Sequence, residues 1–312
     1  MAHLVAFEDV KVTRTERDLP NGHKAWRTDF IKRKKEDPDG PVAFLAESSP
    51  RRVLRSHFHE CDQFQIIAKG DGTLAKHKLA FGGIHFSRAF TPYGPITNGE
   101  EGIGFITLRN KRDPGGGAQY VPDLSDKLKA VKNRDPWQVT EMPTFKALAA
   151  GENTSVVPFE AMKDERGLAG WAVTVRANTK AAAPAPTADG QYIIVTKGSL
   201  LHDGQEKTGL AVIWVGGNEK PFEFHAGTNG VEAVVLNFPH ESDAPAAKPV
   251  NTKADNSEFK SYQCLLCAVV YDEEAGMPEH GIAPGTRWAD VPEDFGCPDC
   301  DAKKTDFELI EF

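Results

Sequence analysis

The chain has few of the cysteines on which small secreted proteins depend. Only five of its 312 residues are cysteine, and four of them form two close pairs, Cys264/Cys267 and Cys297/Cys300, which leaves Cys61 alone. This arrangement excludes a disulfide framework and fits a reducing compartment. We therefore expect a cytoplasmic protein.

Long apolar runs are also missing. The N-terminal residues MAHLVAFEDV contain no basic segment followed by a long apolar run, and no stretch reaches the roughly 20 apolar residues of a membrane helix. The hydrophobic content of 40% is nevertheless enough for two or three globular units, each with a core of its own. We expect no association with a membrane.

Positive charge is scarce and shows no clustering. The net charge is -8; residues 251–312 contain 14 Asp and Glu against 5 Lys and Arg, a balance of -9, which leaves +1 for residues 1–250. The basic run Lys32 to Lys35 stands beside Glu36 and Asp37, so nucleic-acid binding is not expected. The acidic C-terminal region either attracts a basic partner or favours solubility.

Nucleotide-binding motifs are absent as well. The glycines Gly115-Gly116-Gly117 have no following Lys-Ser/Thr, and no G-x-G-x-x-G opens a strand–helix unit. A nicotinamide or flavin domain is therefore not expected. Reducing equivalents for any redox reaction must come from another protein.

The two cysteine pairs are the strongest signal that is present. Each is a Cys-x-x-Cys, and 29 residues separate them. Four thiolates form the soft tetrahedral ligand set that suits iron or zinc. A zinc ribbon usually has a shorter gap of about 15 to 20 residues. The pattern predicts a metal site.

The segment between the pairs resembles rubredoxin from about Tyr262 to Phe307. The resemblance rests on Tyr271-Asp272, Gly276, Pro284-Gly285-Thr286, Trp288 and Cys297-Pro298-x-Cys300. It implies one iron held by the four cysteines, a carrier of single electrons that performs no chemistry on a substrate. It also implies an NAD(P)H-dependent rubredoxin or ferredoxin reductase as partner. A structural zinc site with the same ligands is the alternative.

Two positions depart from the rubredoxin pattern. The family usually has glycine directly after the second and fourth cysteines, where this chain has Ala268 and Asp301. Hydrogen bonds to sulfur and solvent exposure both tune the potential of such a centre, so we expect these residues to affect the redox potential.

Residues 241–257 read ESDAPAAKPVNTKADNS and have no apolar period, which indicates a linker. The rubredoxin-like domain then covers residues 258–312. A linker of this kind tethers an electron carrier beside the preceding domains and raises its effective concentration there.

The first 240 residues are dominated by short runs of β-branched and aromatic residues bounded by Gly, Pro, Asn or Asp, which indicates an all-β sandwich or barrel. Only residues 124–131 and 145–149 favour helix. The predicted strands are Phe64–Ala68, Ile103–Leu108, Trp171–Arg176, Tyr192–Thr196, Leu210–Val215 and Val231–Leu236.

A pattern of metal-binding side chains begins at His57. In a strand alternate residues share a face, so His57, His59, Cys61 and Gln63 are predicted to project to one side. Two imidazoles two residues apart on one face can hold one metal ion. Cys61 is expected to be a small core residue, with a sulfur ligand or a reactive thiol as the alternatives.

Extended further, this pattern resembles the first motif of the cupin family. It reads His57-x-His59, three residues, Gln63, six residues, Gly70, with Gln63 where the family usually has glutamate. The second motif is similar to residues 92–94, Pro-Tyr-Gly, and its closing histidine falls at Thr97.

The cupin resemblance implies a β-barrel in which His57 and His59 hold Fe(II), the second iron of the chain. Gln63 is then a weak ligand or hydrogen-bonds a water or substrate. His77 and His85 are the candidates for a third imidazole. The alternative is that the pair lines a pocket for an organic ligand without metal.

A second copy of the motif follows, which predicts a double cupin. Gln191 to Gly198 repeats the spacing of Gln63 to Gly70, but Ala185 and Thr187 stand where the histidines belong, and His225 is out of register. The first cupin domain is expected at residues 1–135 and a degenerate, metal-free one at 136–240. The copies also allow a homodimer through the cupin domains.

Two classes of function remain open. The first is an oxidoreductase or oxygenase in which the first cupin barrel converts a small organic substrate with electrons from the fused rubredoxin. His57, His59 and Gln63 are then the catalytic residues, while Arg88 and Arg109 either hold a substrate carboxylate or form ion pairs. The second is a non-catalytic binding or assembly protein that carries an electron donor for a separate oxygenase.

Overall fold

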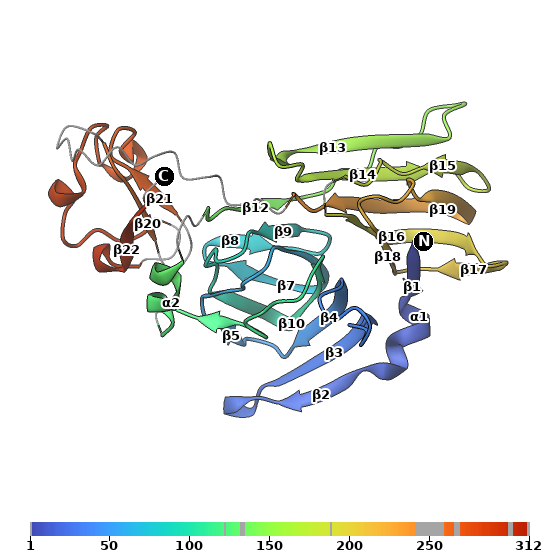
Figure 1. Cartoon of the computed structure of the whole chain (residues 1–312), viewed down its shortest axis with the longest axis horizontal. Coiled ribbons are helices and arrows are strands. Elements are labelled where there is room, and N and C mark those ends of the chain that lie inside the picture. The colour runs from blue at the N-terminus through green and yellow to red at the C-terminus, as the bar shows by residue number, and fades with distance from the viewer. Residues whose placement is uncertain are drawn as a thin grey trace.

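The computed structural model describes residues 2–121, 123–131, 135–187, 189–240, 259–264, 269–298 and 302–310. Its regular structure is almost entirely antiparallel β-strand, in two large sheets and two small ones (Figure 1). The predicted all-β class, with two barrels followed by a small domain, is confirmed. The six predicted strands all fall inside observed strands, to within one residue at their ends.

The first large sheet has the order β2-β3-β4-β10-β7-β9-β12. Short strands extend it at β10 and β7, and β6 and β11 form a separate pair. The strands are β2 (Thr15–Asp18), β3 (Lys24–Ile31), β4 (Val42–Ser48), β5 (Val53–Leu54), β6 (His57–Phe58), β7 (Gln63–Leu74), β8 (His77–Leu79), β9 (Ile84–Ser87), β10 (Ile96–Arg109), β11 (Gln119–Tyr120) and β12 (Gln138–Glu141).

The second large sheet has the order β1-β18-β16-β19-β14-β13, with β17 on β16 and β15 on β19. Two short helices lie in the barrel region, α1 (Phe7–Val10) and α2 (Ser125–Ala130). The strands are β1 (His3–Ala6), β13 (Thr154–Lys163), β14 (Ala169–Val175), β15 (Lys180–Ala182), β16 (Gln191–His202), β17 (Gln205–Thr208), β18 (Ala211–Val215) and β19 (Glu223–Asn237).

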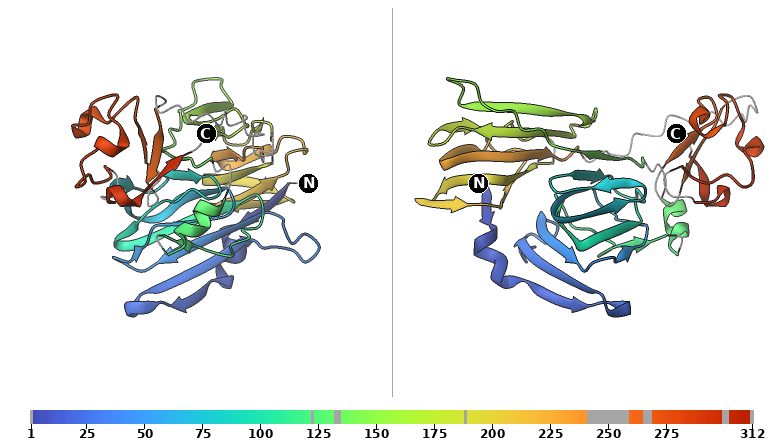
Figure 2. Two further views of the ribbon diagram at one scale, coloured as in Figure 1. Left: turned by 60° about the vertical axis from the view of Figure 1, so that its left-hand side comes forward. Right: turned by 180° about the vertical axis from the view of Figure 1, so that it is seen from behind.

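The two sheets exchange strands across the predicted domain boundary at residues 135/136. β1 pairs with β18 of the second sheet, although it opens the chain, and β12 pairs with β9 of the first sheet. Figure 2 shows the blue N-terminal strand reaching the second sheet. The boundary is therefore not a clean cut, because each sheet is completed by a strand from the other side of it.

The two sheets repeat the same strand plan. Gln63 and Gly70 on β7 stand 128 positions before Gln191 and Gly198 on β16. Each long strand pair, β7 with β10 and β16 with β19, has register shifts near its glycine. The bends let one long strand serve both faces of a curled sheet. The predicted second copy is confirmed as a structural repeat.

The glycines explain why the bend recurs. Gly70 has φ +66° and Gly198 has φ +94°, values that residues with a side chain rarely adopt. A Cβ at either position would lie 2.0 Å from a carbonyl oxygen of the facing strand, that of Gly102 or of Gly230. Only glycine permits this close approach of two backbones.

The largest apolar core lies between the two sheets. Phe64, Ile66 and Leu108 contribute from the first sheet, and Tyr192 and Leu236 from the second. Because side chains alternate along β7, this packing leaves the odd-numbered residues to face the interior of the first barrel. The interface thereby determines which side chains line the candidate site.

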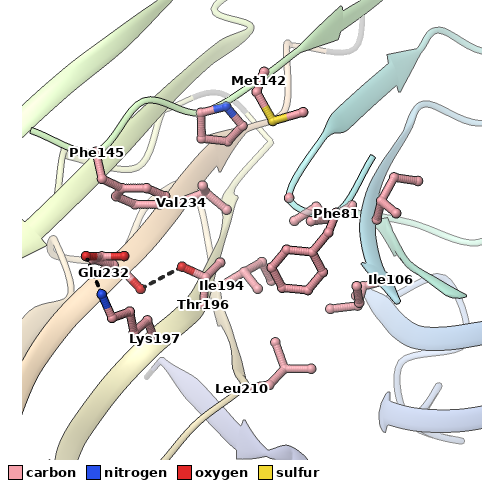
Figure 3. A pocket seen from close by; sticks show the side chains of 15 residues that line it. Phe81, Ile106, Met142, Phe145, Ile194, Thr196, Lys197, Leu210, Glu232 and Val234 are labelled. Atoms are coloured by element: carbon pink, nitrogen blue, oxygen red, sulfur yellow. Dashed lines mark hydrogen bonds and ion pairs between the residues drawn. The ribbon is translucent and has the colours of Figure 1, made fainter. Parts of the chain in front are cut away.

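An apolar groove of about 390 Å³ opens beside this interface, with residues of both sheets and of the segment around Phe145 in its wall (Figure 3). The predicted helix at residues 145–149 is wrong, because this segment has no regular secondary structure and Phe145 packs against the core between the sheets. Five residues are too few to sustain a helix against such packing. The helix predicted at residues 124–131 is confirmed as α2.

The third domain is a small sheet of order β21-β20-β22 with three 3₁₀ turns. Its core collects aromatic rings around Trp288, whose ring lies 4.8 Å from Tyr262 and 5.0 Å from Phe307. The elements are β20 (Ser261–Cys264), β21 (Val270–Asp272), β22 (Phe307–Ile310) and the turns Pro278–His280, Trp288–Asp290 and Lys304–Asp306.

The predicted linker at residues 241–257 lies outside the described residues, as do Cys267, Ala268, Cys300 and Asp301. Within the described part of the chain, no helix has the length and apolar character that crossing a bilayer requires.

Candidate functional sites

The first barrel encloses a cavity of about 560 Å³. Its buried wall carries polar side chains from β6, β7 and β10 and from the loops next to them: His57, His59, Gln63, Tyr93 and Arg109. Its outer wall comes from β2, β3 and β4. A volume of this size suits a small organic ligand.

His57, His59 and Gln63 are brought together as predicted, but they do not share one continuous strand. β6 ends at Phe58, and the chain bends at residues 60 and 61 before β7 begins at Gln63. The predicted alternation therefore fails at Cys61, which is fully buried and does not line the cavity. Burial raises the pKa of the Cys61 thiol to about 12, so the group is protonated at neutral pH and is a poor nucleophile.

Tyr93 connects His57 to Gln63. The Tyr93 hydroxyl lies 3.1 Å from Nε2 of His57 and also bonds Nε2 of Gln63, while Nδ1 of His57 lies 2.8 Å from the carbonyl oxygen of Arg55. Nδ1 of His57 therefore donates to Arg55, Tyr93 donates to Nε2 of His57, and the Gln63 amide donates to Tyr93. Burial and the charge of His59 lower the pKa of His57 to about 3, so the ring is neutral.

Arg109 and Asp113 connect His59 to Gln63. Asp113 lies 2.7 Å from Nδ1 of His59 and 3.2 Å from Nη1 of Arg109. The guanidinium donates through Nε and Nη2 to Oε1 of Gln63, at 3.2 and 3.0 Å. Burial alone would raise the pKa of Asp113, but the hydrogen bond from His59 and the charges of His59 and Arg109 lower it below its ordinary value.

This arrangement does not fit the predicted second iron. Nη2 of Arg109 lies 3.1 and 3.4 Å from the two ring nitrogens of His59, so a cation already occupies the space between His59 and Gln63. The free lone pair of His57 accepts from Tyr93. A metal at this point would face a fixed positive charge with no carboxylate among its three ligands.

The candidates for a third imidazole do not complete the set. His77 is exposed on β8. His85 is buried, and its ring nitrogens lie near Gln65 and Gln138, at 3.4 and 3.0 Å. Thr97 pairs with Thr73 and Val53 in the sheet. In the part of the chain that the structure describes, no three His, Cys, Asp or Glu side chains are grouped to hold a metal.

The second barrel has an apolar interior instead. At the positions 128 residues after Gln65, Thr107 and Arg109 it has Ile193, Val235 and Asn237, and the first two belong to a core cluster inside this sheet. Thr187 accepts a hydrogen bond from the Asn237 side chain at 2.8 Å. The polar cavity is therefore a feature of the first copy.

The remaining candidates divide between the site and the surface. Arg88 lies 2.7 Å from Asp164, also pairs with Asp135, and does not line the cavity, so the ion-pair interpretation applies to it. His225 pairs with Glu223 at the edge of β19. Arg109 does line the cavity. Sequence patterns did not single out Asp113 or Tyr93 as site residues, because neither carries a ligand motif of its own.

The two described cysteines of the third domain, Cys264 and Cys297, have equivalent surroundings. Cys264 and Cys297 are fully buried in the domain core. Each donates its backbone N–H to the carbonyl five residues later, Val269 at 2.8 Å and Ala302 at 2.7 Å. Each hydrogen bond joins residues on either side of a short segment that contains, in the sequence, the second cysteine of the pair. Four thiolates on two such loops fit one tetrahedral iron.

Comparison with known proteins decides the identity of this domain. The rubredoxin family model matches residues 261–307. A rubredoxin of Acinetobacter baylyi is 58% identical over 53 residues, which are 17% of this chain and 98% of that protein. Through its C-terminal domain the chain belongs to the rubredoxin family. The rubredoxin domain is therefore an electron-transfer domain, with iron bound by its cysteines.

Other rubredoxins show the same extent of match. Rubredoxin-1 of Pseudomonas aeruginosa is 60% identical over 53 residues, covering 17% of this chain and 96% of that protein. The high molecular weight rubredoxin of Moorella thermoacetica is 61% identical over 49 residues, but these are only 21% of that protein. The rubredoxin match thus covers only the C-terminal domain of this chain.

The barrels have counterparts among solved structures. A bacterial pirin from Escherichia coli, in complex with nickel(II), superposes with a TM-score of 0.49 at 11% identity, covering 77% of this chain and 100% of that one. An oxalate decarboxylase variant from Bacillus subtilis superposes with a TM-score of 0.46 at 10% identity, covering 77% and 78%. The assignment of two barrels here rests on the strand pairing of the chain itself.

Proposed function

We propose that the chain is a redox protein in which the rubredoxin domain supplies single electrons for the conversion of a small organic substrate in the first barrel. One observation carries the proposal: of two barrels with the same strand plan, the first has a hollow polar interior, while the interior of the second is mainly apolar, with a core cluster that includes Ile193 and Val235. An electron carrier is useful only beside a group that accepts electrons.

Each polar group of the cavity wall has a role in this proposal. Arg109 and His59 face the cavity, where the guanidinium can donate hydrogen bonds to a substrate oxygen and Nε2 of His59 can accept one, while Asp113 holds both side chains in place. Tyr93 and Gln63 fix the orientation of the wall. Because every member bonds a neighbour, the site needs little rearrangement when a ligand enters. The rubredoxin iron, when bound, stores and releases one electron.

The electrons come from another protein in this proposal. The sequence has no dinucleotide-binding motif, so we propose an NAD(P)H-dependent rubredoxin or ferredoxin reductase as the donor. The balance of -9 over residues 251–312 favours a partner with a basic docking face.

Reoxidation of the reduced protein tests the proposal. The full chain is reduced without oxygen, and the visible absorbance of the ferric centre is followed after addition of candidate organic substrates. We expect substrate-dependent reoxidation that an Arg109→Met variant loses, while its iron content stays unchanged. Equal reoxidation rates in the two proteins would contradict the proposal.

Two other functions are tested alongside this proposal: a second iron site at His57 and His59, and ligand binding without catalysis. The rings of His57 and His59 lie only 5.4 Å apart, which favours a metal at the pair if the Arg109 guanidinium leaves. Metal analysis of wild type and a His57→Ala/His59→Ala variant separates the candidates. We expect about one iron per chain in both, whereas a fall from two to one would establish the second iron. A binding protein without catalysis would bind ligands but show no reoxidation.

A further inference from the structure

We propose that the ligand of the first barrel is a small aromatic carboxylate, with its carboxylate held by Arg52 and Arg17 and its ring between aromatic side chains of the outer wall. This inference rests on the proposed function, because it names the substrate class of the same cavity. It follows from the balance of charges along the cavity and from the side chains around it.

Two of the arginines that line the cavity have their charge compensated. Arg109 forms an ion pair with Asp113 at 3.2 Å. Arg27 forms one with Asp29 at 2.7 Å, and its guanidinium lies over the ring of Phe44 at 3.6 Å. These two arginines therefore leave little net charge for a ligand to neutralise.

The lining also contains one carboxylate, Glu47, whose charge is compensated by two ion pairs. Arg14 lies 2.8 Å from Glu47 and Lys69 lies 3.2 Å from it. The hydrogen bonds and charges of these two cations outweigh burial and lower the pKa of Glu47 below its ordinary value. Glu47 therefore offers no counter-charge to the rest of the cavity.

Arg17 and Arg52 are left over. Both line the cavity, and within the described residues neither guanidinium has an ion pair or a side-chain hydrogen bond. Arg52 is only partly exposed, and Arg17 is exposed on β2. A half-buried cation without a partner is unusual, because burial removes water and nothing replaces it.

The two charges also act on each other. Burial lowers the pKa of Arg52 below its ordinary value; Tyr120 acts in the opposite direction, and the charge of Arg17 acts in the same direction as burial. Arg52 nevertheless stays charged at any ordinary pH. An anion between them would satisfy both guanidinium groups at once, and a carboxylate matches their planar geometry.

Aromatic side chains define the rest of the ligand. Trp26, Phe44, Phe105 and Tyr120 line the cavity and are only partly buried. Arg14 lies over the ring of Trp26 at 4.6 Å and Arg27 over that of Phe44 at 3.6 Å, so a ligand would meet the parts of these rings that the cations leave exposed. Flat rings pack favourably against other rings. A cavity of about 560 Å³ has room for one substituted ring.

Calorimetric titration of the full chain tests the inference with three probes. Benzoate has the ring and the charge, benzamide has the ring without the charge, and cyclohexanecarboxylate has the charge without the aromatic ring. We expect benzoate to bind most tightly and its affinity to fall as salt is added, because the contact is ionic.

Variants of the two unpaired arginines compare benzoate binding with and without each charge. Arg52→Gln is expected to weaken benzoate binding about ten- to hundredfold, the loss of a charge-assisted hydrogen bond. Arg17→Gln is also expected to weaken benzoate binding. Because Arg17 is exposed on β2, this substitution removes no side chain from the core and should not unfold the barrel. Arg51→Gln is the matched control, because Arg51 is the sequence neighbour, is 75% exposed and pairs with Glu100 outside the cavity.

The outcomes separate this inference from the proposed function. Benzamide binding as tightly as benzoate, or Arg52→Gln and Arg17→Gln both binding like Arg51→Gln, would overturn the inference. If benzoate binds as expected but no aromatic carboxylate accelerates reoxidation of the rubredoxin iron, the inference stands and the proposed function fails. If only uncharged compounds accelerate reoxidation, the proposed function stands and the inference is wrong.

Discussion

At the scale of single residues, the amide at position 63 explains why the first barrel departs from a metal site. Gln63 donates to the hydroxyl of Tyr93 and accepts from Arg109. A glutamate, the usual cupin residue at this position, can only accept when ionised and would leave Tyr93 without that donor. The substitution therefore suits a hydrogen-bonded wall better than it suits a metal.

Removing the hydroxyl of Tyr93 tests the strength of that wall. Tyr93→Phe leaves Nε2 of His57 and the Gln63 amide without a shared partner inside a buried site. We expect the free energy of unfolding to fall by about 1–3 kcal/mol. Urea unfolding of the barrels measures it. Tyr120→Phe at the rim of the same cavity is the control, and an equal loss in both variants would argue against the network.

His85 makes the folding stability of the first barrel depend on pH. Burial lowers the pKa of His85 to about 4, against 6.5 in the unfolded chain. The stability that this neutral ring confers is complete above pH 6.5 and is lost as the pH falls toward 4, because the unfolded state then binds the proton.

We predict that His85→Gln flattens this pH dependence. Over the window from pH 6.5 to 4 the buried imidazole accounts for up to about 3 kcal/mol, and glutamine has no proton to bind. Unfolding free energies at several pH values between 4 and 7 measure the slope. His77→Gln, at an exposed histidine, is the control.

At the scale of elements, the repeated bend in the long strands is what curls each sheet. The same glycine occurs in β7 and in β16, and in both the facing strand carries another glycine at the point of contact. This device does not involve the histidines of the first copy, so the second copy forms a barrel of the same plan without them.

Alanine at either bend glycine is expected to destabilise its barrel. Gly70→Ala and Gly198→Ala combine a left-handed backbone with a Cβ placed 2.0 Å from a carbonyl oxygen, and we expect each to cost about 3 kcal/mol or more. Gly204→Ala is the control, since its φ is +74° but no atom lies within 4 Å. Thermal unfolding of the three variants decides whether contact or backbone strain dominates.

At the scale of the whole molecule, the barrels and the rubredoxin domain have separate cores. The cluster around Cys264 and Cys297 contains only residues from 259 onward, and the clusters of the barrels contain none of these. Each part can therefore lose its structure without disturbing the core of the other.

Cys264→Ser tests this independence. We expect the iron content to fall from about one per chain to near zero and the rubredoxin domain to lose stability, since metal binding and folding are coupled in small metal domains. The unfolding transition of the barrels should not move. Cys61→Ser, in the first barrel, is the opposite control: it should retain the iron and its visible absorbance.

Much of this architecture was predictable from local patterns. Two Cys-x-x-Cys pairs with the residues between them indicate a rubredoxin whatever precedes them, because ligand spacing is read directly along the chain. Alternating apolar residues likewise indicated the strands and the repeated motif. The predicted helix at residues 145–149 failed because Phe145 packs against a core built from distant residues.

The sequence by itself determined the electron carrier, the all-β class and the meeting of His57, His59 and Gln63, since these depend on spacing and on the alternation of side chains. Only the tertiary structure decided that the guanidinium of Arg109 stands where a metal was predicted. It also decided that β1 belongs to the second sheet and that Arg17 and Arg52 share one cavity. The physical reason is that charges and strand edges find their partners through space, across separations that local sequence patterns do not record.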